Sequence, residues 1–323
     1  MQSTHRPLTR RRILVFEWLC GGGLLLDGLH PDELGGLVAQ GRAMLQAVCA
    51  DFLAAGAEVH VPVDHRMQLE IGSKFFEIPE AKSIIRRLGE LIEDADAVLL
   101  IAPESGGQLE KCLEWFKDSS SKLLNPDLEF TRLCSNKNRL QKHLSDHGVA
   151  VPEGCPAQHL NEFNFQSKNE HGFVIKPNDG CGGAGIEFVE TLDIEAISGK
   201  HADARIEEFI PGQAVSVSAI ATANGFQQFP ALRQRFDSQP VGHFSRCTDD
   251  LNADVAHRSK ELAEKTIAAL PKTTGYFGID MIIGARDVVV EVNPRLTMSY
   301  PVLRDKMDFN LAELMLASKP LGV

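Results

Sequence analysis

Two carboxylates and a carboxamide near the end of the chain have the spacing of a metal site. Glu291 and Asn293 are two residues apart in a run that alternates like a β-strand, which places both side chains on one face. A two-residue turn at positions 285–286 would place Asp280 directly opposite Glu291, with roughly 5 Å between the Cβ atoms. Facing carboxylates repel each other unless a cation lies between them, and Mg²⁺ prefers such oxygen ligands. Asp280, Glu291 and Asn293 are therefore the candidate ligands of Mg²⁺, with Mn²⁺ as an alternative.

The alternative interpretation of these residues is a solvated hairpin that carries ordinary surface charges. The runs 278–284 and 287–293 are otherwise almost entirely apolar, which predicts buried strands. Unpaired carboxylates are very costly to bury, so this pattern favours the metal site. Arg295 follows directly after Pro294, and its planar guanidinium is suited to bind a phosphate or a carboxylate through two N–H groups.

A glycine-rich loop and two lysines could bind phosphate groups. Residues 179–185 include four glycines, among them Gly182 and Gly183, and they follow a strand-like run that ends near Lys176. Glycines allow backbone N–H groups to approach phosphate oxygens closely, and Lys176 and Lys137 would add positive charge. The loop matches neither the Walker A pattern nor the G-x-G-x-x-G pattern that opens a helix. Taken alone, it could be a flexible turn, and Lys137 could be a solvated helix residue.

The segment from Glu207 to Ile210 ends a strand-like run and leads into a Pro-Gly turn. The exposed backbone of such a linker, here around Phe209 and Ile210, can pair with the edge of an adenine base. A nearby carboxylate, Glu207 or Glu208, can bind a ribose or the adenine amino group. On their own, these two glutamates could equally be surface charges.

The elements that must position these residues fall into two groups. In the first group, strand-like runs alternate with helix-like runs, which predicts an α/β domain with a parallel sheet and with binding loops beyond the strand ends. The domain is expected at residues 1–128. Its expected strands cover residues 13–18, 58–63 and 97–101, and its expected helices cover 37–55, 84–92 and a segment that ends at 113.

The second group predicts an α+β domain at residues 129–323, built on antiparallel strands. Asn224 and Gly225 follow one of its strands and predict a hairpin with a type I′ turn. The metal-binding hairpin described above is the last pair of strands. The other expected elements are helices at 136–147 and 254–270 and strands at 173–176, 186–189 and 215–221.

The composition narrows the classes of function. The chain of 323 residues is 43% hydrophobic and 24% charged, which is typical of globular proteins, and its net charge of −11 argues against a nucleic-acid binder. Its seven cysteines are odd in number and scattered, which favours free thiols over a disulfide framework or a zinc site. No apolar run approaches the roughly 20 residues that span a bilayer, and the basic start does not lead into the apolar core of a signal peptide. We expect a cytoplasmic protein that contacts neither a membrane nor nucleic acid.

Taken together and in order, these motifs resemble those of the ATP-grasp superfamily. The resemblance covers roughly residues 130–300, and the ordered set is far more specific than any single motif. Its residues are Asn136-Lys137, Val174-Ile175-Lys176-Pro177, Glu207-Glu208-Phe209-Ile210-Pro211-Gly212, Gly278-Ile279-Asp280 and Glu291-Val292-Asn293-Pro294-Arg295.

The resemblance implies an ATP-dependent enzyme that holds Mg·ATP between two lobes, at about 129–208 and 209–323. The α/β domain looks like the domain that usually precedes this fold. Lys137 and Lys176 would contact phosphates under the glycine-rich loop, and the segment from Glu207 to Ile210 would line the adenine pocket. Lys176 and Arg295 would be catalytic, with Arg295 facing the reacting phosphate.

One departure from the family pattern concerns the ribose. Family members usually carry an acidic residue shortly after the linker glycine. Here Gly212 is followed by Gln213 and Ala214, so that ribose contact is missing or is supplied elsewhere.

The resemblance also implies a reaction. ATP-grasp enzymes usually phosphorylate a carboxylate with ATP, and an amine then attacks the acyl phosphate to give an amide, ADP and phosphate. The partners would be a small-molecule carboxylate and an amine, and a homodimer is compatible with the sequence. The candidate substrate-binding residues are Glu17 with residues 21–23, residues 64–66, residues 104–106, Arg233 and Arg235.

A closer resemblance is to the tyramine–glutamate ligases. It rests on residues 16–18, the glycine turn at 20–23, and Ala102-Pro103-Glu104. It implies glutamate and tyramine as substrates, and a product used in the biosynthesis of methanofuran-type cofactors. Two alternatives stay open: a small-molecule kinase of the same fold, and a nucleotide-binding protein without catalytic activity.

Overall fold

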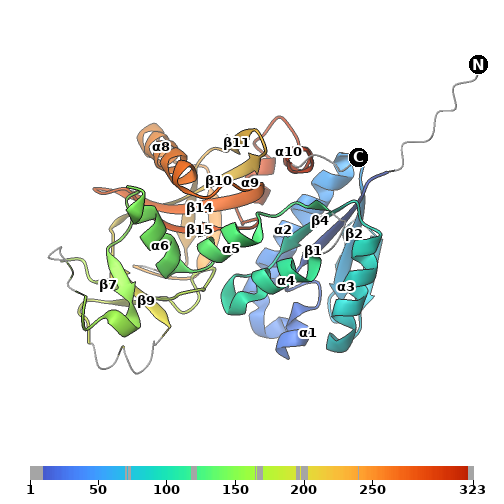
Figure 1. Cartoon of the computed structure of the whole chain (residues 1–323), viewed down its shortest axis with the longest axis horizontal. Helices are drawn as coiled ribbons and strands as arrows, with labels where there is room; N and C mark the ends of the chain where they lie inside the picture. The colour runs from blue at the N-terminus through green and yellow to red at the C-terminus, as the bar shows by residue number, and fades with distance from the viewer. Residues whose placement is uncertain are drawn as a thin grey trace, which may run out of the picture.

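The computed structural model describes residues 10–69, 71, 74–117, 122–163, 165, 170–193, 197, 203–238 and 240–318. Two parts lie side by side (Figure 1): an N-terminal α/β domain, and a larger part that is built mainly from antiparallel strands. This arrangement confirms the fold class that the sequence predicts.

The N-terminal domain is built on a parallel sheet of five strands in the order β3-β2-β1-β4-β5. The central strand β1 and its neighbour β4 are almost entirely apolar and buried, as parallel strands with helices on both faces must be. The strands are β1 (Arg12–Glu17), β2 (Glu58–Asp64), β3 (Lys74–Ile78), β4 (Ala97–Ile101) and β5 (Lys122–Leu123).

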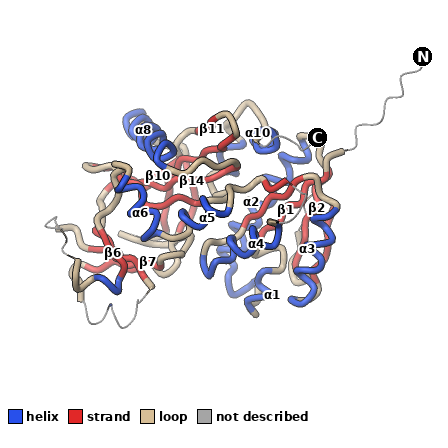
Figure 2. Tube along the Cα trace, in the orientation of Figure 1, coloured by secondary structure: helices blue, strands red, loops and turns tan. Residues whose placement is uncertain are grey.

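Alternate residues of β1 face opposite layers of helices. Ile13 and Val15 belong to the same apolar cluster as the buried side of α2, whereas Leu14 and Phe16 pack with α3 and α4. Helices therefore cover both faces of the sheet (Figure 2). They are α1 (Gly23–Asp27), α2 (Gly35–Ala54), α3 (Ile84–Glu93) and α4 (Gln108–Phe116).

The second part begins with α5 (Leu128–Cys134) and contains two antiparallel sheets. The smaller sheet has the strand order β6-β9-β7-β8, with β6 (Gly154–Pro156), β7 (Phe173–Pro177), β8 (Glu187–Val189) and β9 (Ala204–Glu208). The larger sheet has the order β13-β12-β10-β14-β15, and β11 pairs with β10. Its strands are β10 (Gly212–Thr222), β11 (Gly225–Gln228), β12 (Leu232–Phe236), β13 (Phe244–Thr248), β14 (Gly275–Gly284) and β15 (Val288–Asn293).

Two helices, α6 (Lys137–Asp146) and α8 (Ala253–Ala269), pack on the larger sheet. Each begins after an asparagine, Asn136 or Asn252, whose side-chain oxygen accepts the backbone N–H three residues later at 2.9 Å. Apolar residues such as Leu140 and Leu262 then join Ile279 of β14 in one buried cluster. The caps explain where these helices begin, and the apolar faces explain where they pack.

The last two helices, α9 (Tyr300–Arg304) and α10 (Leu311–Ala317), return to the N-terminal domain. Asp51 of α2 accepts hydrogen bonds from the Tyr300 hydroxyl and from Arg304 Nη2, both at 2.7 Å. Apolar residues of α9 and α10 share a cluster with α2. These contacts join the two parts of the chain, while the domain limits of 1–128 and 129–323 stay predictions.

The helices and strands expected from the sequence are present to within a few residues, but other elements were not predicted. They are the strands β3, β5, β6, β12 and β13 and the helices α1, α5, α9 and α10. Two of these strands show the reason. β3 is an edge strand in which Phe75 is exposed, so its apolar residues do not alternate cleanly between core and solvent. β5 has only two residues and no periodicity of its own. The positions of β3 and β5 are set by pairing with neighbouring strands, and no local sequence pattern marks them.

The type I′ turn predicted near residue 224 is wrong. The hairpin between β10 and β11 forms, but Thr222 pairs with Gly225, so the turn residues are Ala223 and Asn224. A type I′ turn requires a positive φ at both turn residues. In the described part of the chain, only glycines have a positive φ, and Gly225, with φ of 141°, takes it as the first residue of β11.

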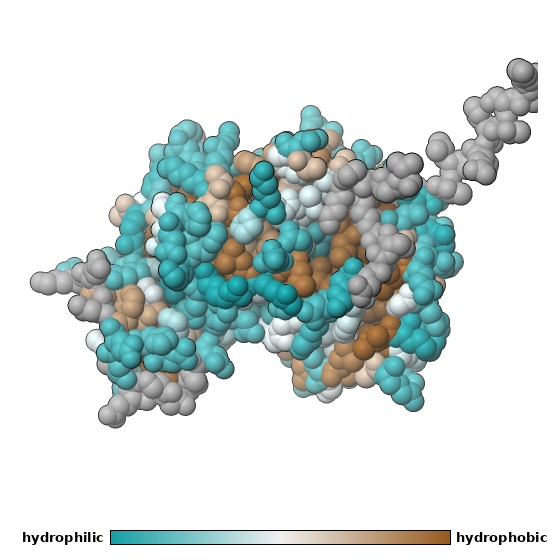
Figure 3. All heavy atoms as spheres, viewed as in Figure 1, coloured by the Kyte–Doolittle hydropathy of each residue, from teal (hydrophilic) through white to brown (hydrophobic). Residues whose placement is uncertain are grey.

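Polar side chains cover most of the visible face of the molecule (Figure 3). Among the described residues, the exposed large apolar side chains are Leu26, Phe75, Ile85, Phe226 and Phe309. Within the described ranges, no helix combines the length and the apolar character needed to cross a membrane.

The junction between the two parts passes close to Gly275, and this makes a testable prediction about folding. A Cβ atom at Gly275 would lie 2.4 Å from the Leu124 carbonyl oxygen, and the residue has φ of +98°. Gly275→Ala should lower the free energy of unfolding by about 1–3 kcal/mol, because neither the backbone nor the neighbouring segment can give way easily. Urea unfolding followed by circular dichroism measures this.

Gly35→Ala is the matched control. Gly35 has helical backbone angles and no atom lies within 4 Å of its Cβ position. Alanine there should leave stability unchanged or raise it. Equal unfolding midpoints for both variants would contradict the packing argument.

Candidate active site

The predicted pairing of Asp280 with Glu291 across β14 and β15 is confirmed. The predicted two-residue turn is wrong, because Met281 pairs with Val289 and the register shifts by one residue between Asp280 and Met281. The turn is longer, and the extra residue at position 290 compensates for it. The longer turn and the extra residue at position 290 shift the strand pairing in opposite directions. Asp280 therefore still faces Glu291, as predicted.

The longer turn has a physical cause in Asp287. The Gly284 N–H donates to Asp287 Oδ1 at 3.1 Å, and Arg258 Nε donates to Asp287 Oδ2 at 2.8 Å. These bonds hold Asp287 as a turn residue instead of the first residue of β15. Alternation in the sequence could not show this, because Arg258 lies on α8.

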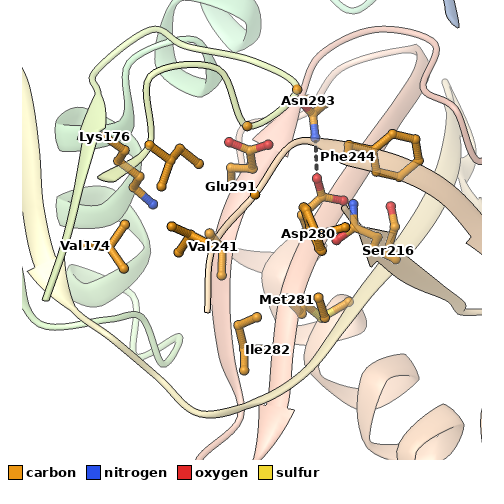
Figure 4. A pocket seen from close by; sticks show the side chains of 18 of the residues that line it. Val174, Lys176, Ser216, Val241, Phe244, Asp280, Met281, Ile282, Glu291 and Asn293 are labelled. Atoms are coloured by element: carbon orange, nitrogen blue, oxygen red, sulfur yellow. Dashed lines mark hydrogen bonds between the residues drawn. The ribbon is translucent and has the colours of Figure 1, made fainter. Parts of the chain in front are cut away.

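The two facing carboxylates have different environments. Asp280 Oδ2 accepts a hydrogen bond from Asn293 Nδ2 at 3.0 Å (Figure 4), whereas Asp280 Oδ1 is buried and has no hydrogen-bond partner in the described structure. Burial, reinforced by the negative charge of Glu291, raises the pKa of Asp280. Burial acts in the same direction on Glu291, but the positive charges of Lys137 and Lys176 outweigh it and lower the pKa of Glu291.

The donor set of this hairpin suits a hard cation that depends on its substrate for further ligands. No group of three or more His, Cys, Asp or Glu residues that could hold a metal ion occurs among the described residues. Asp280, Glu291 and Asn293 offer two carboxylates and one amide. Mg²⁺ is commonly held by one or two carboxylates together with water and phosphate oxygens.

Lys176 on β7 is buried beside Glu207 on β9. Its Nζ lies 2.5 Å from Glu207 Oε1, and Arg205 Nε donates to Glu207 Oε2 at 2.8 Å. The Lys176–Glu207 contact lacks hydrogen-bond geometry, so the ammonium group has no hydrogen-bond partner in the part of the chain that is described. Burial lowers the pKa of Lys176, although the charge of Glu207 works against it.

Lys137, the first residue of α6, connects three parts of the site. Its Nζ lies 3.1 Å from Glu291 Oε2 and donates to the carbonyl oxygen of Gly180 at 2.5 Å. Its backbone N–H donates to the carbonyl oxygen of Asn178 at 2.9 Å. The start of α6 therefore holds both the metal-site carboxylate and the entrance of the glycine-rich loop.

The glycine-rich loop between β7 and β8 has the backbone conformation that glycine allows. Gly182 and Gly183 have φ of 64° and 80°, and a Cβ atom on Gly183 would lie 2.6 Å from the Gly242 carbonyl oxygen. The Gly106 N–H of the N-terminal domain donates to Asp179 Oδ2 at 2.9 Å. The loop is thus packed between the β12–β13 connection and the N-terminal domain.

Several polar groups of the linker after β9 are hydrogen-bonded or ion-paired to other protein groups. The Phe209 N–H donates to the Gly172 carbonyl oxygen at 2.9 Å, and the Glu208 carboxylate accepts the Glu153 N–H at 2.7 Å and pairs with Arg286. Ile210 therefore offers the backbone donor to test for adenine recognition. The nucleotide-binding roles of Glu207, Glu208, Phe209 and Ile210 stay predictions.

All twelve predicted site residues line one cavity of about 490 Å³. Figure 4 shows Lys176 and Glu291 on opposite sides of this cavity, with Asp280 and Asn293 beside Glu291. The twelve are Lys137, Lys176, Gly182, Gly183, Glu207, Glu208, Phe209, Ile210, Asp280, Glu291, Asn293 and Arg295.

The candidate substrate residues divide into two groups. Arg233 and Arg235 line the cavity and pair with Asp250. Glu17 and Asp64 do not line it: Glu17 is buried where it accepts the Cys20 N–H at 2.7 Å, and Asp64 pairs with Arg66.

Part of the cavity wall was not foreseen from the sequence. It consists of residues from α2, from β13 and its preceding loop, and from the segment after Arg295. Apolar residues of α2 predict only a buried helix face, so no local signal marks them as cavity residues. They are Gln40, Met44, Val241, Phe244, Cys247, Thr297, Met298 and Ser299.

Two buried polar atoms of the cavity wall are incompletely satisfied within the described residues. Lys176 Nζ is ion-paired with Glu207 but makes no hydrogen bond of regular geometry, and Asp280 Oδ1 has no hydrogen-bond partner. Such groups are costly unless a ligand completes them. A phosphate chain that carries a divalent cation would satisfy both, so the residues present fit Mg·ATP.

The environment of Cys181 in the glycine-rich loop leads to a labelling prediction. Among the described residues, Cys181 is the one free cysteine that is not buried, and burial of its thiol nevertheless raises its pKa. Iodoacetamide should therefore modify Cys181 first, at a rate that rises with pH through the alkaline range, because the thiolate is the reactive form. Mg·ATP should slow this reaction several-fold.

Mass spectrometry of the alkylated peptides measures this labelling. Cys181→Ala is the control, which should remove the fast phase. Equal rates with and without Mg·ATP would show that the loop does not cover the nucleotide.

A model of the ATP-grasp domain family matches residues 134–299, and a model of a pre-ATP-grasp domain matches residues 57–129. Among curated proteins, tyramine–L-glutamate ligase of Methanocaldococcus fervens is 25% identical over 313 residues, which cover 94% of this chain and 92% of that protein. The predicted superfamily is thereby confirmed.

Solved structures share the fold. An Archaeoglobus fulgidus structure assigned to the ATP-grasp superfamily has a TM-score of 0.74 and 19% identity, covering 96% of this chain and 89% of that one. D-alanine–D-alanine ligase of Bacillus anthracis, complexed with ATP, has a TM-score of 0.61 and 20% identity over 95% of this chain and 96% of its own. From its family domain and its relatives, this chain belongs to the ATP-grasp family, as an ATP-dependent carbon–nitrogen ligase.

Proposed function

We propose that the protein uses Mg·ATP to join a small carboxylic acid to an amine through an acyl phosphate, with glutamate and tyramine as the substrate pair. The observation that carries the proposal is the pair of incomplete polar groups in one cavity, the Lys176 ammonium and the Asp280 carboxylate. The near full-length similarity to tyramine–L-glutamate ligase supports the choice of acid and amine.

In this proposal, the positively charged residues of the cavity bind phosphate groups, and the carboxylates and the amide bind the metal ion. Lys176 and Lys137 bind phosphate oxygens, and the N–H groups around Gly182 and Gly183 add donors above them. Asp280, Glu291 and Asn293 would hold the metal ion. When bound, Mg²⁺ supplies charge neutralisation for the transferred phosphoryl group. Arg295 adds a fixed positive charge at the edge of the cavity that lies next to the N-terminal domain.

No covalent intermediate on the protein is required. The carboxylate oxygen of the acid attacks the γ-phosphorus of ATP, the bond to the bridging oxygen breaks, and ADP leaves. The amine then attacks the acyl carbon, phosphate leaves, and the amine loses a proton. Exclusion of water from the site while the acyl phosphate is present would protect it from hydrolysis.

The wall beside the metal hairpin suits an amine with an apolar body. Met44, Phe244, Cys247 and Met298 line the cavity and belong to, or pack against, one apolar cluster. Phe244 lies next to Asn293 and Asp280 in Figure 4, on the side away from Lys176. An aromatic ring would bury apolar area there.

Glu291→Gln tests the metal site. The substitution keeps the shape of the side chain but removes the charge that faces Asp280, so kcat should fall by at least about 100-fold, since charge stabilisation by a metal is worth several kcal/mol. The fold should remain intact by circular dichroism. Asp287→Asn, on the same hairpin but outside the cavity, should keep most of the activity. Near wild-type turnover in Glu291→Gln would remove the metal assignment.

The substrate pair is tested by combining acids and amines with Mg·ATP. Glutamate with tyramine should release ADP, phosphate and amide in equal amounts, measured by coupled assays and mass spectrometry. Hydroxylamine in place of the amine should trap the acyl phosphate as a hydroxamate. A stable phosphorylated product would indicate a kinase instead, and Mg·ATP binding without turnover of any pair would indicate a binding protein.

A further inference from the structure

The turn between β4 and α4 in the N-terminal domain contacts the predicted catalytic arginine. Glu104 is only 5% exposed, and its Oε2 atom accepts hydrogen bonds from Arg295 Nε at 3.1 Å and Nη2 at 2.8 Å. The third nitrogen, Nη1, donates to the Leu296 carbonyl oxygen at 3.2 Å. The direction of the Arg295 guanidinium is therefore set largely by a residue 191 positions earlier in the chain.

The same turn also contacts the glycine-rich loop. The Gly106 N–H donates to Asp179 Oδ2 at 2.9 Å, and the Ser105 hydroxyl donates to Cys181 Sγ at 3.7 Å. Three consecutive residues of the N-terminal domain thus reach two separate elements of the ATP site. One is the segment after β15, and the other is the loop that would cover the phosphates.

Charge explains why Arg295 needs a partner of its own. Arg295 follows Glu291 by four positions at the end of β15, and both side chains line the same cavity. Without Glu104, the guanidinium would be drawn towards Glu291 and would compete with Lys137 and with a metal ion for the same oxygens. An arginine paired with Glu104 leaves Glu291 available.

The Glu104–Arg295 pair is not explained by the stability of the fold. Glu104 Oε1 is buried and has no hydrogen-bond partner in the described structure. A buried ion pair with an incomplete carboxylate adds little net stability. The arrangement is more readily explained by a need to fix the guanidinium.

We propose that Glu104 is a positioning residue for catalysis: it holds the Arg295 guanidinium at the phosphate end of the cavity and away from Glu291, while Ser105 and Gly106 hold the glycine-rich loop against the N-terminal domain. The N-terminal domain thereby completes the ATP site. This inference rests on the proposed function for the role of Arg295, but the loop contacts can be tested without any substrate.

The kinetic test uses Glu104→Gln, which removes the charge and keeps the shape. Its kcat should fall about 10- to 100-fold, because the guanidinium loses a charged hydrogen-bond acceptor, with KM for ATP nearly unchanged. Glu104→Asp should recover part of the rate. Arg295→Gln and the double variant should have similar rates, because the two residues act as one unit.

Arg304→Gln is the matched control. It removes the Arg304–Asp51 ion pair, which joins the same two parts of the chain away from the cavity. Its melting temperature should fall at least as far as that of Glu104→Gln, while kcat stays near the wild-type value. Equal kcat in Glu104→Gln and Arg304→Gln would overturn the positioning role. So would a double variant in which the separate losses of Glu104→Gln and Arg295→Gln multiply.

Alkylation of Cys181 by iodoacetamide at pH 8 provides the substrate-free test. Burial raises the pKa of Cys181, Arg295 lowers it and Glu104 raises it. Glu104→Gln should speed labelling several-fold, because the thiol pKa falls and the loop loosens, whereas Arg304→Gln should not. An unchanged rate in Glu104→Gln would refute the inference. Absence of turnover in the wild-type protein would refute only the proposed function.

Discussion

The repulsion between two half-buried carboxylates, Asp280 and Glu291, is the constraint on which the site depends. They face each other across β14 and β15, where nearly every neighbour is apolar. Lys137, whose Nζ lies 3.1 Å from Glu291, and the charges of Lys176 and Arg295 keep Glu291 ionised. These three cations offset the charge of Glu291 inside the protein, and a phosphate chain would contact the same cations. The same positive charges would therefore serve both stability and function.

The cations need partners in turn, and these partners join parts of the chain that are distant in sequence. Lys176 faces Glu207, which also binds Arg205 on the smaller sheet. Arg295 binds Glu104 in the N-terminal domain. Three separate groups of ion pairs therefore surround the cavity: Arg205–Glu207–Lys176, Lys137–Glu291 and Glu104–Arg295. Hydrogen bonding remains incomplete at Lys176 and Asp280, where a ligand with both anionic oxygens and a cation would fit.

Much of the architecture, and the placement of the twelve candidate site residues in one cavity, could be predicted, because their signals are local. The alternation in β14 and β15, the asparagine cap of α6 and the glycines after β7 each appear within a few adjacent residues. The predictions failed where a distant contact decided the outcome. Arg258 on α8 holds Asp287 in the turn and thereby lengthens it, and the edge strand β3 follows its neighbour in the sheet instead of a pattern of its own.

The sequence by itself determined which residues are candidates for binding Mg·ATP, because side-chain chemistry and spacing along strands are properties of adjacent positions. Only the tertiary structure decided what surrounds them. The Glu104–Arg295 pair spans 191 positions, and the cavity wall of Met44, Phe244 and Met298 comes from three separate segments. A buried pair or wall of this kind forms because folding brings oppositely charged or apolar groups together away from water. The local sequence of one segment does not indicate which distant residues it will contact.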